Sequence, residues 1–266
     1  MIAEELYGDE IFTQSLGSEA DRLRAIADTY DHVSRRQIRQ LRLPPTSRCL
    51  DAGAGSGSIA DWLARTFPAG HVTAADRDTR MLEAVARGRD NLHAVQGDLS
   101  ADFLDPTHRF DLVHARFLLM HLRERDAVLQ RLADLVEPGG WIMVSDSVDL
   151  TTPALLDTPY GQVMNTMWTV LHTTIGTDIT RVTTTPALLA GHGFTDLSVE
   201  VHLPSADRHS PVARFWHLTW EQMRERLLAT GALDAATLDR ALADLGADGF
   251  ARLSPGMITT RARRPA

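Results

Sequence analysis

A glycine-rich segment, Asp51-Ala52-Gly53-Ala54-Gly55-Ser56-Gly57, carries the clearest chemical signal in the chain. Glycines let a backbone turn tightly and lie close against a ligand. A helix that starts directly after them offers free N–H groups to a polar or anionic group. Three glycines at alternate positions, between an expected strand and an expected helix, favour a binding loop over a plain turn. The segment therefore predicts that a nucleotide-like ligand sits at the start of a helix.

Two carboxylates flank this loop, Asp51 before it and Asp76 at the end of the next expected strand. A dinucleotide fold expects the spacing G-x-G-x-x-G, but here the third glycine comes one residue early and Ser58 occupies the dinucleotide position. Asp76 is placed to accept hydrogen bonds from a ribose diol. Asp51 would repel a pyrophosphate and would favour a cationic ligand such as a sulfonium or its amine. This contrast favours S-adenosylmethionine, while a nicotinamide dinucleotide stays open as an alternative.

A third carboxylate, Asp98, follows the third expected strand in Gln96-Gly97-Asp98-Leu99. Residues at the carboxyl end of a sheet strand face the ligand crevice of an open α/β fold. Asp98 would accept a hydrogen bond from the exocyclic amine of adenine, with Leu99 against the ring. Gly-Asp after a strand is also an ordinary turn, but the register with Asp51 and Asp76 favours the ligand interpretation.

The elements that position these residues alternate between strands and helices from about residue 48 to residue 146. Such alternation predicts parallel strands with helices on both faces, a doubly wound α/β sheet. Nearly continuous apolar strands agree, because parallel strands are buried on both sides. The expected strands are Arg48–Asp51, His71–Ala75, Leu92–Gln96, Phe110–His114 and Trp141–Ser145. The expected helices are Ser58–Thr66, Thr79–Arg87 and about Glu124–Val136, with a turn at Pro138-Gly139-Gly140.

Further segments frame this α/β core on both sides. Residues 1–45 show apolar residues at helical spacing and end at Pro44-Pro45, which stops a helix. Residues 153–192 and 211–245 are expected to be helical, and Thr195–Leu203 and Met257–Arg263 are expected strands. No linker is clear enough to define a second domain. We therefore expect residues 1–45 as an N-terminal helical segment and residues 46–266 as one core with two helical insertions.

Composition excludes several classes of function. The net charge of −8 argues against nucleic acid as the main partner. All 27 basic residues other than histidine are arginines, which excludes Schiff-base chemistry and the phosphate-binding lysine of P-loop enzymes. The single cysteine, Cys49, excludes an intrachain disulfide and a four-thiolate zinc site. The first twenty residues are acidic and no apolar run reaches the roughly 18–20 residues of a membrane helix, so we expect a cytoplasmic protein.

These motifs, taken in order, resemble the class I S-adenosylmethionine-dependent methyltransferases, and within them the ubiquinone/menaquinone-type and antibiotic-tailoring small-molecule enzymes. The matching segments cover about residues 20–146, with a weaker likeness over Leu188–Val199 and Pro255–Pro265. The resemblance implies a Rossmann-like sheet of seven strands whose last strand is antiparallel. It also implies that the N-terminal helices form a lid. The segments that carry it are Leu50–Gly57, Thr73–Asp78, Gln96–Leu99, Phe110–Leu122 and Leu135–Ser145.

The resemblance further implies S-adenosyl-L-methionine as methyl donor, S-adenosyl-L-homocysteine as product, and a set of residues that bind them. The glycines would cradle the methionine part, Asp76 the ribose and Asp98 the adenine, and the residues after the fourth strand would close over the donor. The acidic pair with which catechol-type enzymes hold magnesium is not evident there, and no metal site is expected. The implied donor-binding residues are Asp51, Gly53, Ala54, Gly55, Gly57, Asp76, Arg77, Met81, Asp98, Leu99, Ala115, Arg116 and His121.

Methyl transfer from a sulfonium is an in-line displacement, in which the enzyme aligns nucleophile and methyl group and excludes water. A general base helps only where the nucleophile must lose a proton. His121 and Tyr30 are the catalytic candidates, although each also suits a packing or lid role. Candidates for the acceptor pocket are Tyr7, Trp168, His172 and His217, from the segments that flank the core.

The expected function is O- or C-methylation of a small, hydrophobic metabolite, as in antibiotic biosynthesis and other secondary metabolism. One alternative is a protein of the same fold that binds the donor and catalyses a non-methylating reaction such as a cyclisation. The other is a nicotinamide-dependent oxidoreductase. The expected partner is a small-molecule acceptor, without nucleic acid or membrane insertion, and a homodimer is left open.

Overall fold

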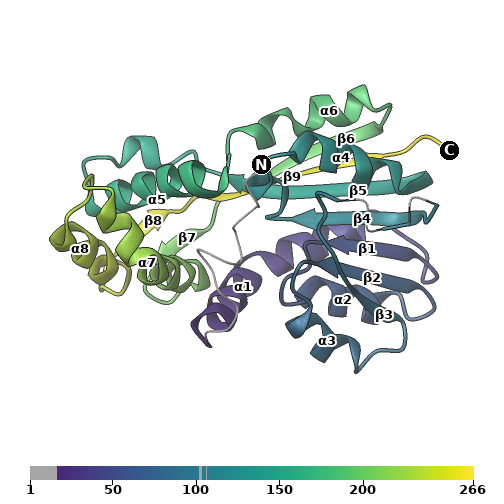
Figure 1. The fold of residues 1–266 in the computed structure, drawn as a ribbon, viewed down its shortest axis with the longest axis horizontal. Coiled ribbons are helices and arrows are strands. Elements are labelled where there is room, and N and C mark those ends of the chain that lie inside the picture. The colour runs from purple at the N-terminus through teal and green to yellow at the C-terminus, as the bar shows by residue number, and fades with distance from the viewer. Residues whose placement is uncertain (1–16, 102–103, 106) are drawn as a thin grey trace. The chain divides into compact units, whose positions relative to one another are not determined.

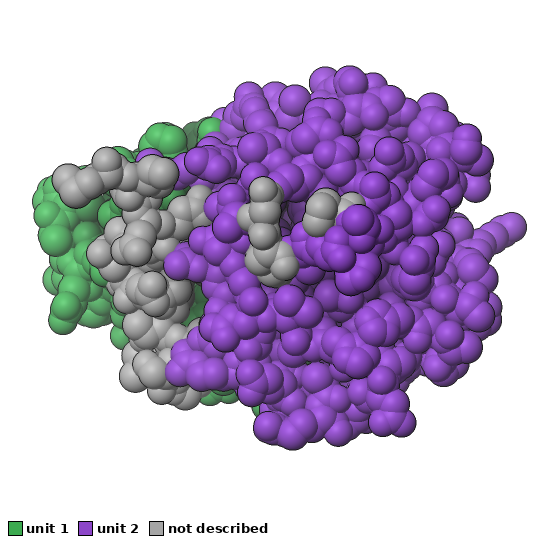
Figure 2. Space-filling model, turned by 45° about the vertical axis from the view of Figure 1, so that its right-hand side comes forward, with its two compact units in different colours: residues 1–30, 148–179, 202–256 green, residues 31–147, 180–201, 257–266 purple. Residues whose placement is uncertain are grey.

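The computed structural model describes residues 17–101, 104–105 and 107–266, which form two compact units. Among the described residues, unit 1 comprises 17–30, Val148–Ile179 and His202–Gly256, and unit 2 comprises those of Asp31–Ser147, Thr180–Val201 and Met257–Ala266. Figure 2 colours unit 1 green and unit 2 purple. Each unit is therefore assembled from segments that are distant in the sequence.

Unit 2 is built on a seven-stranded sheet (Figure 1). β1 pairs in parallel with β2 on one side and with β4 on the other, and β2–β3 and β4–β5 are parallel as well. The chain thus reverses its direction of winding at β1, and ligands of open α/β sheets bind at such a switch point, beyond the carboxyl ends of the strands. The strand order is β3 (Leu92–Gln96), β2 (His71–Asp76), β1 (Arg48–Ala52), β4 (Phe110–Arg116), β5 (Val136–Val148), β9 (Gly256–Arg263) and β6 (Thr195–His202).

The last strand of the chain, β9, runs antiparallel to β5. The N–H of Arg264 donates to Gly140 O at 2.9 Å. Five residues later in β5, the Ser145 hydroxyl lies 2.8 Å from the hydroxyl of Thr259, which is five residues earlier than Arg264. The predicted mostly parallel seven-stranded sheet is confirmed. The turn predicted at Pro138-Gly139-Gly140 is wrong, because these residues form an irregularity inside β5 where the register against β4 shifts.

Helices cover both faces of the sheet. Alternate strand residues face opposite sides: Cys49 belongs to a core with α2 (Ser58–Thr66) and α3 (Arg80–Ala86), and Leu50 to a core with α4 (Arg125–Asp134) and α6 (Thr185–Gly191). Burial of apolar surface in these two layers stabilises the sheet by about 25 cal/mol per Å². The three-layer arrangement is the predicted doubly wound fold, and α2 and β3 begin and end at the predicted residues.

Unit 1 is a helical bundle with its own apolar core, to which the first part of α1 (Gly17–Gln40) contributes Ala25. In the described residues its other α-helices are α5 (Pro159–Ile175), α7 (Pro211–Ala229) and α8 (Ala235–Leu245), and a short 3-10 helix, η3 (Thr152–Ala154), precedes α5. Each of these three α-helices follows a residue whose side chain accepts a backbone N–H of the first turn. These residues are Thr158 before α5, Ser210 before α7 and Asp234 before α8. Such caps satisfy donors that a helix start leaves free.

This division differs from the expected segment 1–45 and single core 46–266. α1 contributes residues to both units, and the expected insertion at 153–192 supplies α5 to unit 1 and α6 to unit 2. A pair of antiparallel strands in unit 1, β7 (Ser205–Asp207) and β8 (Ala251–Leu253), was not predicted. Three residues are too few to display the alternation that identifies a strand.

No helix in the described part of the chain combines the length and the hydropathy that crossing a membrane requires. The lid function of the N-terminal helices stays a prediction.

Candidate functional site

The glycine loop joins β1 to α2 and adopts a backbone that only glycine takes readily. Gly53, Gly55 and Gly57 have φ angles of 68°, 54° and 78°, in the left-handed region. The N–H of Gly53 donates to Ala75 O at 2.8 Å, which holds the loop against the end of β2. A Cβ built on Gly53 would lie 2.9 Å from Leu118 Cδ1, whereas one on Gly55 would meet nothing within 4 Å. The Cα of Gly55 therefore faces open space, so a ligand group can approach the backbone there.

Asp76, at the end of β2, is tied to this loop. Its Oδ2 accepts the N–H of Gly55 at 2.8 Å, and its Oδ1 accepts the N–H of Asp78 at 3.1 Å. Burial raises the pKa of the Asp76 carboxyl, and the hydrogen bonds from Gly55 and Asp78 oppose that rise. The carboxylate also accepts a backbone hydrogen bond from Arg77, and its four lone pairs leave one for a ligand. Asp76 can thus hold the glycine loop and still accept a hydroxyl from a ligand.

Asp51 and His114 form a buried pair at the carboxyl ends of β1 and β4. The two residues are register partners across these strands, and His114 Nδ1 lies 2.7 Å from Asp51 Oδ1. His114 is fully buried, and its Nε2 has no hydrogen-bond partner among the described residues. The sequence analysis placed His114 at the end of an expected strand and did not predict its contact with Asp51. Both residues end strands that the sequence predicts, but only the observed register of β1 against β4 pairs them.

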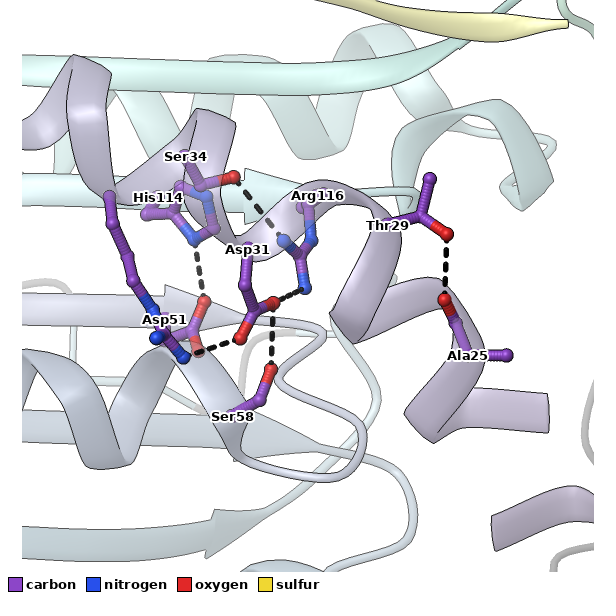
Figure 3. A network of polar contacts seen from close by, with 9 residues as sticks. Ala25, Thr29, Asp31, Ser34, Asp51, Ser58, His114 and Arg116 are labelled. Atoms are coloured by element: carbon purple, nitrogen blue, oxygen red, sulfur yellow. Dashed lines mark hydrogen bonds and ion pairs between the residues drawn. The ribbon is translucent and has the colours of Figure 1, made fainter. Parts of the chain in front are cut away.

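Arg116, the last residue of β4, is held by the C-terminal half of α1 (Figure 3). Its Nη2 lies 2.8 Å from Asp31 Oδ1 and its Nη1 donates to Ser34 Oγ at 3.3 Å. Ser58 Oγ, at the start of α2, donates to the same Asp31 oxygen at 3.1 Å, and Arg35 donates to the other at 2.7 Å. Sequence reasoning missed Asp31, because its spacing within α1 does not reveal which loops its helix touches.

The ends of β2 and β3 bring the remaining predicted donor residues to the same edge of the sheet. The N–H of Gly97 donates to Asp76 O at 3.0 Å, and Asp98 Oδ1 accepts the N–H of Ser100 at 2.8 Å. Asp98 therefore makes a turn, and its second oxygen remains for a ligand. Leu99 and Ala115 are buried in the apolar core, Met81 is half-buried in α3, and Arg77 is exposed.

The loop after β4 is fixed by the end of β5. The N–H of Phe117 donates to Ser145 O at 2.7 Å, and the carboxylate of Asp146 accepts the backbone N–H groups of Leu118 and Met120. Burial raises the pKa of Asp146 to about 7. His121 is half-buried in the 3-10 helix η2 (Leu119–His121), so its position depends on this support. Asp146 was not identified from the sequence, since it sits inside an ordinary apolar strand.

The expected catalytic and acceptor residues outside this edge lie in unit 1. Tyr30 is buried and its hydroxyl donates to Pro255 O at 3.2 Å. Trp168 donates from Nε1 to Asp149 Oδ2 at 2.8 Å and packs against the apolar core of its unit. His172 and His217 are exposed on α5 and α7, where His172 Nδ1 lies 2.9 Å from Thr177 O at the helix end. Tyr7 lies outside the described residues.

Within the described residues, no cluster of three or more histidine, cysteine, aspartate or glutamate side chains is arranged to hold a metal ion.

A methyltransferase domain family matches residues 20–199 of the chain. The chain belongs to this family. The predicted resemblance to class I S-adenosylmethionine-dependent methyltransferases is confirmed, and S-adenosyl-L-methionine is the cofactor of such enzymes.

Two curated relatives show how far the likeness reaches. Methyltransferase str3 of Strobilurus tenacellus is 34% identical over 133 residues, which are 48% of this chain and 46% of that protein. The ubiquinone biosynthesis O-methyltransferase of a Bradyrhizobium strain is 30% identical over 131 residues, 47% of this chain and 49% of that protein. The likeness thus spans about half the length of these relatives.

Among solved structures, a SAM-dependent methyltransferase of Geobacter sulfurreducens in complex with S-adenosyl-L-homocysteine has the same fold. It superposes with a TM-score of 0.55 at 18% identity, over 90% of this chain and 92% of that one.

Proposed function

We propose that this protein transfers a methyl group from S-adenosyl-L-methionine to a small, apolar acceptor, with the donor bound at the carboxyl ends of β1, β2 and β4. The observation that carries the proposal is the backbone of Gly55. Its left-handed conformation turns an unobstructed Cα outward, while its N–H is fixed by Asp76. A backbone held in this way is suited to close contact with the methionine part of the donor.

The charges at this edge of the sheet support a cationic ligand. Asp51, Asp76 and Asp98 all lie at strand ends around the glycine loop, and the guanidinium of Arg116 is paired with Asp31. An excess of carboxylates attracts a sulfonium and its ammonium group and repels a pyrophosphate. This arrangement favours S-adenosyl-L-methionine over a nicotinamide dinucleotide.

When bound, S-adenosyl-L-methionine supplies an electrophilic methyl group. The chain's own residues then have to orient the donor and keep water away from it. We assign Gly53, Gly55 and Gly57 to the methionine part, Asp76 to the ribose and Asp98 to the adenine. The other proposed donor residues are Asp51, Ala54, Arg77, Met81, Leu99, Ala115, Arg116 and His121.

His121 is the better candidate for moving a proton. The Tyr30 hydroxyl already donates to Pro255 O, so it would first have to release that bond in order to act on a substrate. His121 is half-buried at the end of the loop after β4, on the same edge of the sheet as Arg116. A general base is required only if the acceptor loses a proton, as a phenol does.

For the acceptor we propose O-methylation of a small aromatic or quinone-like metabolite, in secondary metabolism. The ubiquinone biosynthesis O-methyltransferase among the relatives supports this chemistry. Trp168, half-buried against the apolar core of unit 1, is the acceptor candidate whose surroundings suit an apolar molecule. Tyr7, His172 and His217 stay in the proposal as predictions.

Calorimetry with S-adenosyl-L-methionine and with NADH, followed by mass spectrometry of reactions with a panel of phenols and quinones, tests this function. We expect the methyl donor to bind, NADH not to bind, and one member of the panel to gain the mass of a methylene group. Binding of NADH alone would favour the oxidoreductase alternative. Binding of the donor without consumption by any acceptor would favour a non-methylating reaction on the same fold.

A further inference from the structure

We propose that Asp31 is a positioning residue that joins two loops of the donor site and neutralises Arg116, so that the site prefers the cationic donor over its neutral product. This inference rests on the proposed function, because it assumes that the donor binds at the carboxyl ends of β1 and β4.

Three chain segments meet at the Asp31 carboxylate (Figure 3). Asp31 itself lies in α1, Arg116 ends β4, and Ser58 is the first residue of α2, directly after Gly57 of the glycine loop. Both Arg116 and Ser58 bond to Oδ1, at 2.8 Å and 3.1 Å. One oxygen atom thus links the glycine loop to the residues that follow β4.

The contact is largely closed to solvent. The side chains of Arg116 and Asp31 are 11% and 10% exposed. Water screens such a pair less than it screens a surface ion pair, so removing one partner leaves a charge that its surroundings compensate poorly. Asp31 also accepts from Arg35 through Oδ2, which fixes the carboxylate from a second direction.

Without Asp31, Arg116 would place an uncompensated positive charge at the edge of the sheet where the donor binds. S-adenosyl-L-methionine carries a sulfonium, whereas S-adenosyl-L-homocysteine has a neutral thioether once the methyl group has left with the acceptor. A positive charge nearby therefore opposes binding of the donor and leaves binding of the product almost unaffected. Asp31 shifts this balance toward the donor, so the donor competes better with the product for the site.

The test compares affinities for the two ligands in wild type and in D31N. Asparagine keeps one oxygen that can accept from Ser58 and Arg116. It removes the charge and replaces the oxygen that accepts from Arg35 with an amide NH2 group. By calorimetry at low salt we expect D31N to bind S-adenosyl-L-methionine roughly 3- to 30-fold more weakly, and S-adenosyl-L-homocysteine less than about threefold more weakly. D28N is the matched control, because it removes the same charge from an exposed position of the same helix.

The double variant D31N/R116Q separates charge from structure. It removes both charges, so the ratio of the two affinities should return toward the wild-type ratio even if both ligands bind more weakly. Equal weakening of both ligands in D31N, or no recovery of the ratio in the double variant, overturns the proposal. If wild type binds neither ligand, the proposed function itself fails. If wild type binds both ligands and D31N shows the same ratio of affinities as wild type, only the inference about Asp31 fails.

Discussion

At the scale of single residues, Asp76 has two proposed roles at the end of β2. It fixes Gly55 through a 2.8 Å hydrogen bond and is the proposed partner of the ribose. D76A should therefore weaken donor binding by roughly 1–3 kcal/mol, the cost of leaving buried polar groups unpaired. Calorimetry measures this directly, with D78A as control, because the Asp78 side chain pairs with the exposed Arg80. An unchanged affinity in D76A would remove Asp76 from the ribose site.

Asp146 should make stability depend on pH. Burial raises its pKa from 3.8 to about 7, so between these values the folded chain binds more protons than the unfolded chain. The free energy of unfolding should consequently fall as pH rises through this window, by an amount on the order of a few kcal/mol. D146N keeps an acceptor for Leu118 and Met120 and cannot ionise. Urea unfolding from about pH 4.5 to about pH 8 should show a weaker decline in D146N, and equal declines in both proteins would contradict this assignment.

At the scale of elements, the backbone conformation of the glycine loop should affect stability and donor binding more than the packing of the loop does. In G55A the added Cβ meets no protein atom, but the alanine has to adopt the left-handed backbone conformation of Gly55. Because this conformation is unfavourable for alanine, about 1–2 kcal/mol of stability should be lost. The methyl group would project into the space where the donor approaches, and we expect at least about tenfold weaker binding.

Gly193 offers a matched control for that element. It has a φ of 83° and an equally unobstructed Cα position, but it follows α6 and lies outside the proposed site. G193A should lose a similar amount of stability and keep the donor affinity of wild type. Parallel thermal unfolding and calorimetry would distinguish the two variants, and equal loss of binding in both would argue against a special role for Gly55.

At the scale of the whole molecule, each unit has its own apolar core. Leu238 of α8 is fully buried in the core of unit 1, so L238A should lower the free energy of unfolding by about 2–5 kcal/mol. The proposed donor residues belong to unit 2, so the folded variant should bind the donor as wild type does. L253A, at a position that is 54% exposed in the same unit, should change stability by less than about 0.5 kcal/mol. A loss of donor affinity in folded L238A would contradict this separation.

The fold class and the glycine loop at its centre could be predicted from the amino-acid sequence alone. Apolar strands that alternate with helices are a local pattern, and the need for glycine at φ angles of 54° to 78° is a local property of the backbone. The ends of α2 and β3 and the place of Asp76 at the end of β2 could be predicted in the same way. Membership of the methyltransferase family agrees with that reading.

Which distant residues support the loop became evident only from the way the elements pack. Asp31 meets Arg116, separated by 85 residues, because a helix packs beside β4, and Asp51 meets His114 because β1 pairs with β4 in one particular register. Asp146 reaches the loop after β4 because β5 pairs with β4. The division into two units depends on which helices share an apolar core. These contacts depend on how elements pair and pack, and the spacing of residues along the chain does not contain that information.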